Sequence, residues 1–467
     1  MPRATEVIPL PWTFSVREAL AAWQRGVPLL ALTSGDDCGA HDRWSLLAPR
    51  TTSSHIRATD PSAGTQLGRC LREGATSANP ALAANGKRLP FAGGWIGFVG
   101  YECGALLEPR ARAGGHGAHS GVDTDWPDAM FFEVPRALLY SHELRQWWEV
   151  GDPEATRVAQ CVEAELAPVR GREESRRAWE TARSGALESS WTASEFRAAV
   201  ARATDLIRGG DIFQANVAQP FTAAIEGCAR AFAVDTISRT APRYGALLEL
   251  DSTHTLLSLS PELFLEIDGA TRRVLTRPMK GTRPTEAGEA DLLASPKDAA
   301  ELHMIVDLMR NDLGRVCAVG SVRVERDRTI ERHPTVLQGV GEVSGTLSPE
   351  ASLDQVFRAA FPPGSVTCAP KIRAMQVIEE LEGEPRGPYC GAIGFASGCG
   401  TSMFSVGIRT AKLSREHGER WSIEYRAGCG IVAESDPDEE LAESIAKTRI
   451  LREALDAGNA VAQPALT

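Results

Sequence analysis

A lysine followed by glycine and threonine stands in the segment Thr276–Pro284, which reads Thr-Arg-Pro-Met-Lys-Gly-Thr-Arg-Pro. Lys280 can act as a nucleophile where burial or a neighbouring cation lowers its pKa, and an arginine lies three residues to either side. Gly281 lets the backbone approach a ligand closely, and Thr282 offers a hydroxyl and an N–H. A single lysine of this kind is more often an exposed residue on a hairpin, so the segment alone does not decide the chemistry.

The residues before this segment predict the element that carries it. Apolar and polar residues alternate over Phe264–Ile267, Asp268 and Gly269 follow, and Arg273–Leu275 is apolar again. This pattern is typical of strand, turn and strand. We therefore expect the lysine segment at or near the end of a hairpin strand.

Two carboxylates are expected on one face of a helix over residues 296–311. Ser295 is a good N-cap and is followed by proline at the first helical position. Asp298 and Glu301 are three residues apart, so they lie one turn from each other on the same face. Glu301 borders the apolar stripe, where a carboxylate is costly unless it is paired or binds a metal.

The same spacing returns near the end of the chain. A helix predicted to open at residues 435–438 carries Glu440 and Glu443, with Lys447 one turn further along. Four carboxylates on two helices could hold one divalent cation, and all-oxygen ligands favour Mg²⁺. The alternative is two solvated acidic first turns that the helix dipole favours. The buried side of the second helix is expected to carry two apolar residues, Leu441 and Ile445.

Glycines could form an anion site after a predicted strand over residues 421–426. Gly428 and Gly430 flank Cys429, and two glycines spaced this way can turn successive N–H groups toward an anion, as a nest. A plain tight turn is the commoner use of such a pair.

Two further side chains could contact a polar ligand. Arg409 is expected near the end of a strand over residues 403–410, and arginine binds carboxylates bidentately. A surface ion pair is the commoner role for such an arginine. Tyr389 offers a phenol, although a tyrosine packed in the core is the simpler interpretation.

Composition bounds the classes of protein. The chain has 467 residues, of which 43% are hydrophobic and 24% charged, as in a globular protein. The net charge of −11 argues against nucleic acid or an anionic membrane as the main partner. No apolar run is long enough to span a membrane, and we see no signal peptide. The ten cysteines contain no Cys-x-x-Cys pair, which favours free thiols in the cytoplasm.

The chain divides into two predicted parts. Residues 1–168 alternate short apolar runs with turns, which indicates a β-rich subdomain. Residues 168–190 are polar and read as a linker or a loop between halves. Residues 190–457 form the second part, which opens with a helix capped at Thr192. We expect the two halves to share one core.

Five motifs in order resemble the chorismate-utilising enzymes. The resemblance is strong over residues 190–457 and weaker at 93–97. The motifs are Ser260–Phe264, Pro278–Pro284, Glu301–Arg315, Phe361–Lys371 and Ala427–Val432.

The resemblance implies a fold and an activity. The fold would be α+β, with large antiparallel sheets packed as a sandwich and helices outside. Chorismate and Mg²⁺ would bind in the second half, residues 190–457. With a lysine at position 280, the chain resembles the members of the family that aminate chorismate to 4-amino-4-deoxychorismate, on the route to 4-aminobenzoate and folate. The anthranilate-forming branch usually has a small residue there. Ammonia would come from solution or from a separate glutamine amidotransferase subunit, since no Gly-x-Cys-x-Gly nucleophile segment is visible.

The resemblance also assigns roles to individual residues. Lys280 would add to the ring as the C4 hydroxyl departs, and Glu262 would be a general acid and base near the leaving and entering groups. The metal ligands would be Glu301 and Glu443, with Asp298 and Glu440 as their helical partners, directly or through water. The expected contacts to substrate are Gly281, Thr282, Tyr389, Arg409, Gly428, Cys429, Gly430 and Lys447.

Two positions depart from the family pattern. Many relatives have histidine where Gln338 stands, so no histidine role carries over to it. Cys368 stands where glycine is usual before Ala-Pro-Lys, which should make that loop bulkier. Relatives can also hold tryptophan in the first half; Ser34 is a candidate contact, although a serine in a turn is the simpler interpretation.

Three alternatives remain open at this point. An anthranilate-forming enzyme would also eliminate pyruvate, and an isochorismate- or salicylate-forming enzyme would use water in place of ammonia. A catalytically silent subunit that binds an aromatic ligand is the alternative from another class of protein. Product analysis with chorismate, Mg²⁺ and ammonium separates them.

Overall fold

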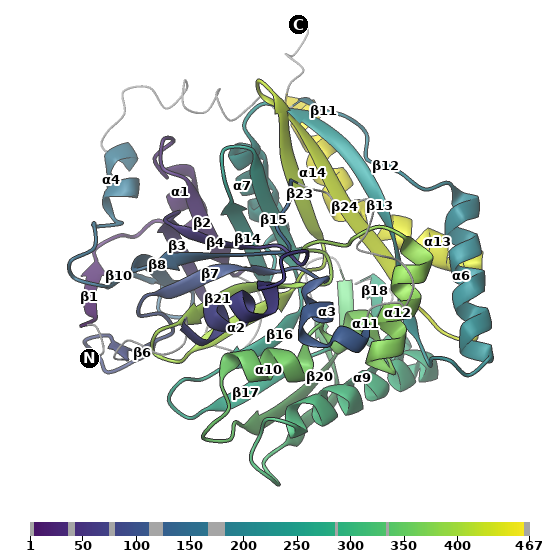
Figure 1. Cartoon of the computed structure of the whole chain (residues 1–467). Helices are drawn as coiled ribbons and strands as arrows, with labels where there is room; N and C mark the ends of the chain where they lie inside the picture. The colour runs from purple at the N-terminus through teal and green to yellow at the C-terminus, as the bar shows by residue number, and fades with distance from the viewer. Residues whose placement is uncertain are drawn as a thin grey trace, which may run out of the picture.

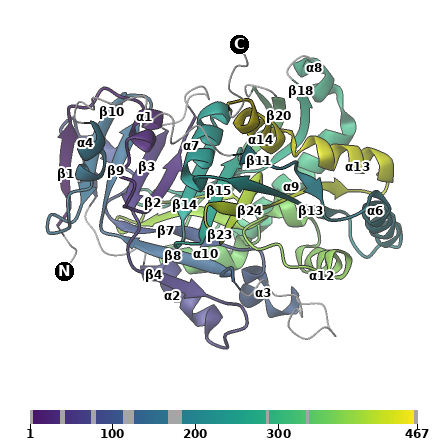
Figure 2. The same ribbon diagram turned by 90° about the horizontal axis from the view of Figure 1, so that it is seen from above.

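The computed structural model describes residues 4–35, 43–73, 80–111, 125–166, 183–284, 288–332 and 336–461. Figure 1 shows two large sheets with helices around them, and Figure 2 shows the same chain from above. All strand pairs in the two large sheets are antiparallel. The expected α+β architecture with large antiparallel sheets is therefore confirmed.

The first sheet has twelve strands among the described residues. In order across the sheet they are β1 (Glu6–Leu10), β10 (Gln146–Gly151), β9 (Arg136–Ser141), β3 (Trp44–Pro49), β2 (Leu29–Thr33), β14 (Tyr244–Glu249), β15 (His254–Ser260), β23 (Thr410–His417), β24 (Arg420–Ile431), β13 (Ala215–Glu226) and β11 (Arg183–Ser184), and β12 (Glu188–Ser189) also pairs with β13.

The second sheet has ten strands among the described residues. Their order is β18 (Met279–Pro284), β20 (Val336–Thr346), β17 (Arg273–Arg277), β16 (Leu263–Ile267), β22 (Ser402–Val406), β21 (Ala392–Ser397), β7 (Gly94–Val99), β8 (Ala129–Val134) and β4 (Ser53–Ile56), and β19 (Arg323–Arg332) pairs with β20. A small third sheet pairs β5 (Ala81–Leu82) with β6 (Arg88–Leu89).

Helices lie on the outer faces of the sheets (Figures 1 and 2). They are α1 (Val16–Ala21), α2 (Ala63–Glu73), α3 (Cys103–Leu107), α4 (Gln160–Leu166), α6 (Ala193–Arg208), α7 (Ala229–Thr240), α8 (Glu289–Ala294), α9 (Pro296–Gly314), α10 (Leu353–Ala360), α11 (Gly364–Thr367), α12 (Lys371–Glu382), α13 (Pro437–Ala446) and α14 (Arg449–Val461), with a 3₁₀ turn at Pro109–Ala111. No described helix is both long and apolar enough to cross a bilayer.

The two sheets pack face to face around a shared apolar layer. Leu30 and Leu139 of the first sheet lie in one buried cluster with Phe98 and Ile393 of the second. Both sheets also contain strands from both halves of the chain, so the halves share this core. The division into residues 1–168 and 190–457 stays a prediction, because most of the proposed linker lies outside the described residues.

Local signals in the sequence explain the elements near the lysine segment. β16 and β17 form the expected hairpin, and the lysine segment continues directly into β18, which pairs with β20. Ser295 caps α9 by accepting a hydrogen bond from the N–H of Asp298. Asp436 caps α13 in the same way, from the N–H groups of two residues in its first turn.

Three local expectations were wrong. Of the two apolar residues expected on the buried side of α13, Leu441 packs partly buried against a core cluster, but Ile445 is 43% exposed. The fully buried residues of this helix are the polar Glu440 and Ser444. Arg409 does not end a strand; it lies between β22 and β23 with a φ of 51°. The expected glycine nest is absent as well: Gly428 and Gly430 lie inside β24, where they pair in register with β13, so their backbone is extended.

Candidate active site

Gly281 lets the backbone of the lysine segment lie close to α9. The register of β18 against β20 shifts between Lys280 and Thr282, and Gly281 between them has a φ of 78°. A Cβ at Gly281 would lie 2.9 Å from Asp298 Cγ and 2.9 Å from Leu292 Cδ1. Glycine is required here for both reasons, and the resulting turn of the backbone places Lys280 beside the carboxylates of α9.

The amine of Lys280 lies in a confined polar space. Its Nζ is 3.8 Å from Glu301 Oε2, and the two side chains are 12% and 15% exposed. Gln214 donates its amide to the same carboxylate oxygen at 2.9 Å. A Cβ at Gly430 would lie 2.8 Å from Lys280 Nζ and 2.8 Å from Gln214 Nε2, so a larger residue there would displace the ends of these two side chains.

Glu262 is the second titratable group at the amine. It is 4% exposed and lies between β15 and β16. Burial raises its pKa to about 7, while Ser365, the ammonium of Lys280 and the N–H of Met279 oppose the rise. A carboxyl with this pKa can both donate and accept a proton near neutral pH.

Asp298 of α9 and Glu440 of α13 each accept a hydrogen bond from a neighbouring side chain. Arg283 donates to Asp298 at 2.7 Å. Ser435 donates to Glu440 at 2.7 Å. Burial, together with Glu443, raises the pKa of Glu440, although the Ser435 hydroxyl opposes this.

Glu443 faces three ammonium groups. Lys447 Nζ lies 2.7 Å from Glu443 Oε1 and also donates to the Gly428 carbonyl at 2.8 Å. Burial favours the neutral acid, but Lys447, Lys280 and Lys297 hold the pKa of Glu443 below its ordinary value. Glu301 and Glu443 thus come from different helices and both interact with the Lys280 ammonium.

The carboxylates fit a hard divalent cation. One ligand atom each from Cys429, Glu440 and Glu443 lies within 4.8 Å of the others. Burial raises the pKa of the Cys429 thiol well above its usual value, which leaves the oxygens as the donors at neutral pH. Carboxylate oxygens are the ligands that Mg²⁺ prefers, so Glu440 and Glu443, with Glu301 across from them, suit that ion.

Two further candidate contacts lie outside the strands: Arg409 between β22 and β23, and Tyr389 before β21. Arg409 has no ion-pair partner among the described residues, and burial lowers its pKa. It interacts electrostatically with the phenol group of Tyr425, whose hydroxyl donates to the Lys447 carbonyl at 3.2 Å. Tyr389 is 6% exposed and hydrogen-bonds Asn216, and burial raises its pKa well above the ordinary value. A partly buried guanidinium without a carboxylate partner among the described residues is suited to an anionic ligand.

Comparison with known proteins places this arrangement in one family. The chorismate binding enzyme profile matches residues 34–453. The chain belongs to the chorismate-binding enzyme family. The family resemblance read from the five motifs is therefore confirmed.

Individual relatives refine this membership. Aminodeoxychorismate synthase component 1 of Klebsiella aerogenes is 34% identical over 96% of this chain and 98% of its own length. Anthranilate synthase component 1 1 of Haloarcula marismortui is 41% identical, but over 58% of this chain and 55% of its own length. The crystal structure of anthranilate synthase component I from Streptococcus pneumoniae TIGR4 superposes with a TM-score of 0.73 at 28% identity, covering 89% of this chain and 93% of the other.

Two residues matter at the family site that sequence reasoning missed or placed incompletely. Gln214 was not among the candidates from the sequence, and the structure shows its amide donating to Glu301. Its Oε1 is buried without a hydrogen-bond partner among the described residues. Cys368 is fully buried beside Lys280 and Glu301, and burial raises its pKa to about 11. Its φ of 81° with a ψ of −159° is a conformation that glycine adopts readily and other residues at a cost.

Two other positions that the sequence singled out are Gln338 and Ser34. Gln338 is buried in β20, opposite Thr282 of β18, and the Thr282 side chain is outside the described residues. Ser34 donates to the Arg243 carbonyl at 3.2 Å, and its N–H donates to Ser45. Its role as a tryptophan contact stays a prediction.

The raised pKa of Glu262 predicts a pH-dependent change in stability. The folded carboxyl has a pKa of about 7 and the unfolded one 4.5, so the folded state loses stability as pH rises through this range. Glu262→Gln removes the buried charge and should raise the free energy of unfolding at pH 8 by on the order of 2 to 3 kcal/mol. At pH 5 the two proteins should differ much less. Urea unfolding at both pH values measures this, and an equal difference at pH 5 and pH 8 would refute it.

Proposed function

We propose that this chain aminates chorismate with ammonia to give 4-amino-4-deoxychorismate, as component 1 of an aminodeoxychorismate synthase. The observation that carries the proposal is the amine of Lys280, which lies 3.8 Å from Glu301 and beside Glu262. Relatives with this name match nearly the whole chain, at 34% identity over 96% and at 32% over 95% of its length.

Lys280 acts as the nucleophile in this proposal. The Lys280 ammonium first gives a proton to the carboxylate of Glu262. The neutral amine then forms a carbon–nitrogen bond to the ring, and the C4 hydroxyl leaves as water with that proton from Glu262. Ammonia then forms a bond at C4, the bond between the ring and Nζ breaks, and its electron pair returns to the lysine. The carboxylate of Glu262 takes the surplus proton of ammonia. A carboxyl with a pKa of about 7 serves both steps.

The other residues bind and orient the substrate. Arg409 and Lys447 supply cations for the substrate carboxylates, and Gly430 keeps the space above the amine open. Mg²⁺, held by Glu301 and Glu443 with Asp298 and Glu440 behind them, would anchor a substrate carboxylate and offset the negative charge of the site.

Ammonia in this proposal comes from a separate glutamine amidotransferase subunit, and the product serves the synthesis of 4-aminobenzoate and folate in the cytoplasm. The free thiols suit a reducing compartment: Cys429, Cys390 and the other cysteines among the described residues form no disulfide.

Anthranilate formation is the second candidate, because a relative named anthranilate synthase component 1 1 is 41% identical over 58% of the chain. Incubation of the purified chain with chorismate, Mg²⁺ and ¹⁵N-ammonium, followed by mass spectrometry, separates the two. We expect ¹⁵N-labelled 4-amino-4-deoxychorismate that retains the enolpyruvyl group. Anthranilate with release of pyruvate would refute the proposal, and so would the absence of any labelled product.

Removal of the Lys280 amine should separate binding from chemistry. Lys280→Ala should lose amination by at least about 10³-fold, since no group replaces the nucleophile, yet keep Mg²⁺-dependent binding of chorismate. Stopped assays measure the turnover and calorimetry measures the binding. Lys87→Ala, which removes a lysine paired with Glu143 in the first half, is the control and should keep full turnover. Full turnover in Lys280→Ala would contradict the covalent step.

Replacement of a carboxylate on α13 should weaken the binding of Mg²⁺. Glu443→Gln removes one charged oxygen from the candidate metal group and should raise the Mg²⁺ concentration needed for half-maximal turnover by at least about tenfold. Glu439 lies on the same helix and its side chain is exposed, so Glu439→Gln is the matched control. An identical Mg²⁺ requirement in both variants would count against Glu443 as a ligand.

A further inference from the structure

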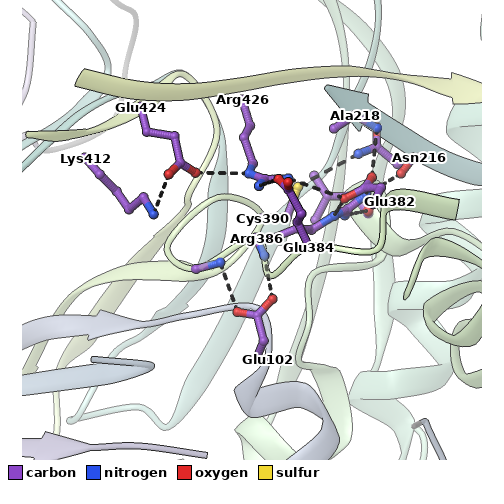
Figure 3. A network of polar contacts seen from close by, with 12 residues as sticks. Glu102, Asn216, Ala218, Glu382, Glu384, Arg386, Cys390, Lys412, Glu424 and Arg426 are labelled. Atoms are coloured by element: carbon purple, nitrogen blue, oxygen red, sulfur yellow. Dashed lines mark hydrogen bonds and ion pairs between the residues drawn. The ribbon is translucent and has the colours of Figure 1, made fainter. Parts of the chain in front are cut away.

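A buried arginine behind the site contacts three of the segments that surround Lys280. Arg386 follows α12 and is 2% exposed. Its guanidinium binds both oxygens of Glu382, through Nε at 2.8 Å and Nη2 at 2.5 Å. Figure 3 shows this pair at the centre of the polar network.

The first contact is with β13, the strand that follows Gln214. No described strand pairs with its outer edge at residues 215–218. Arg386 donates to the Asn216 carbonyl there, and Glu382 accepts from the Ala218 N–H at 2.8 Å (Figure 3). A backbone group that is buried without a hydrogen-bond partner is costly, so this pair holds the strand in place.

The second and third contacts reach the other walls of the site. Arg386 Nη1 donates to the Val366 carbonyl at 3.5 Å, next to Ser365, whose side chain lies beside that of Glu262. The guanidinium also lies over two buried rings, 4.6 Å from the centroid of Tyr101 and 5.6 Å from that of Tyr389. Tyr389 is in turn a candidate contact to substrate.

A residue from the first half of the chain also binds the backbone of this arginine. Glu102, at the start of α3, accepts from the N–H of Arg386 at 2.6 Å and from that of Gly387 at 2.9 Å (Figure 3). The loop that carries the guanidinium is therefore fixed by a carboxylate from the other half of the fold.

We propose that Arg386, held by Glu382 and Glu102, is a positioning residue for the reaction at Lys280. It touches no reacting atom; it sets the place of β13 with Gln214, of α11 with Ser365, and of Tyr389. The inference rests on the proposed function, because that function defines the reaction whose geometry Arg386 controls. Displacement of reacting groups by about 1 Å can cost about 10²-fold in rate, so the consequence is measurable.

Arg386→Lys tests this, because it keeps the charge and loses the fork of donors. The matched control is Arg426→Lys. Arg426 lies in the same network, and its side chain is 4% exposed. Its side-chain contacts among the described residues are all with carboxylates, namely Glu384 at 3.1 Å, Glu424 at 3.2 Å and Glu382 at 3.9 Å. We expect kcat with ammonium to fall by about 10- to 100-fold in Arg386→Lys at a KM for chorismate within about threefold. In Arg426→Lys the thermal midpoint should fall while kcat stays within about twofold of the parent.

A double substitution identifies the route of the effect. If Arg386 acts through β13, Gln214→Ala in the Arg386→Lys background should cost much less in kcat than Gln214→Ala alone. Glu102→Gln, which removes one of two acceptors and leaves the Arg386–Glu382 pair intact, is the milder second variant. It should lower kcat several-fold at an unchanged thermal midpoint.

These measurements test the role of Arg386 independently of which product the chain forms. The comparison between Arg386→Lys and Arg426→Lys uses whichever product the parent chain forms, so a wrong product overturns the proposed function alone. Calorimetric Mg²⁺ affinity without substrate is a readout independent of turnover, and Arg386→Lys should weaken it several-fold through Gln214 and Glu301. Equal kcat losses in the two arginine variants, additive effects with Gln214→Ala, or an unchanged Mg²⁺ affinity would overturn the positioning role.

Discussion

The contact on which the structure of the site depends is the one between the amine of Lys280 and the carboxylate of Glu301. A lysine amine placed in a confined space would be costly on its own, and the neighbouring carboxylates offset that cost. The same carboxylates suit a divalent cation, so the site holds charges of both signs at close range. Two glycines leave room for this arrangement, since a Cβ at 281 would meet Asp298 and a Cβ at 430 would meet the Lys280 amine.

The two sheets make this contact possible because they bring distant segments together. Lys280 is on a strand of the ten-stranded sheet, while Gly430 and Gln214 belong to or adjoin the twelve-stranded sheet. Helices α9 and α13 add the carboxylates from the outside. Because both sheets contain strands from both halves of the chain, changes in the first half can reach the site, and Glu102 is one specific connection of this kind.

Local signals in the sequence predicted the parts of the site that local physics determines. The Ser295 cap with proline after it and the Asp436 cap place α9 and α13 where expected, and the alternating run before Lys280 predicts the hairpin. The glycine pair at 428 and 430 was misread as a nest, because the long pairing of β24 with β13 keeps the backbone extended. Ile445 was expected to be buried from helical period alone, but α13 packs a polar face on the site.

Long-range polar contacts could not be read from the sequence. Gln214 and Glu301 are 87 positions apart, and Arg386 and Asn216 are 170 apart, so no local pattern joins them. The unusual backbone of Cys368 has a partial signal, since family members usually have glycine there, and the structure shows why that glycine suits the position.

The central claim is that Lys280 bonds covalently to the substrate ring. The most direct measurement is the mass of the chain after it is mixed with chorismate and Mg²⁺ in the absence of ammonia and quenched in acid. We expect a fraction of the chain to be heavier by the mass of chorismate minus water, with the added mass on the peptide that contains Lys280. This fraction should disappear when ammonium is added. Labelled product from ammonium without any such adduct, at times from milliseconds to steady state, would contradict it.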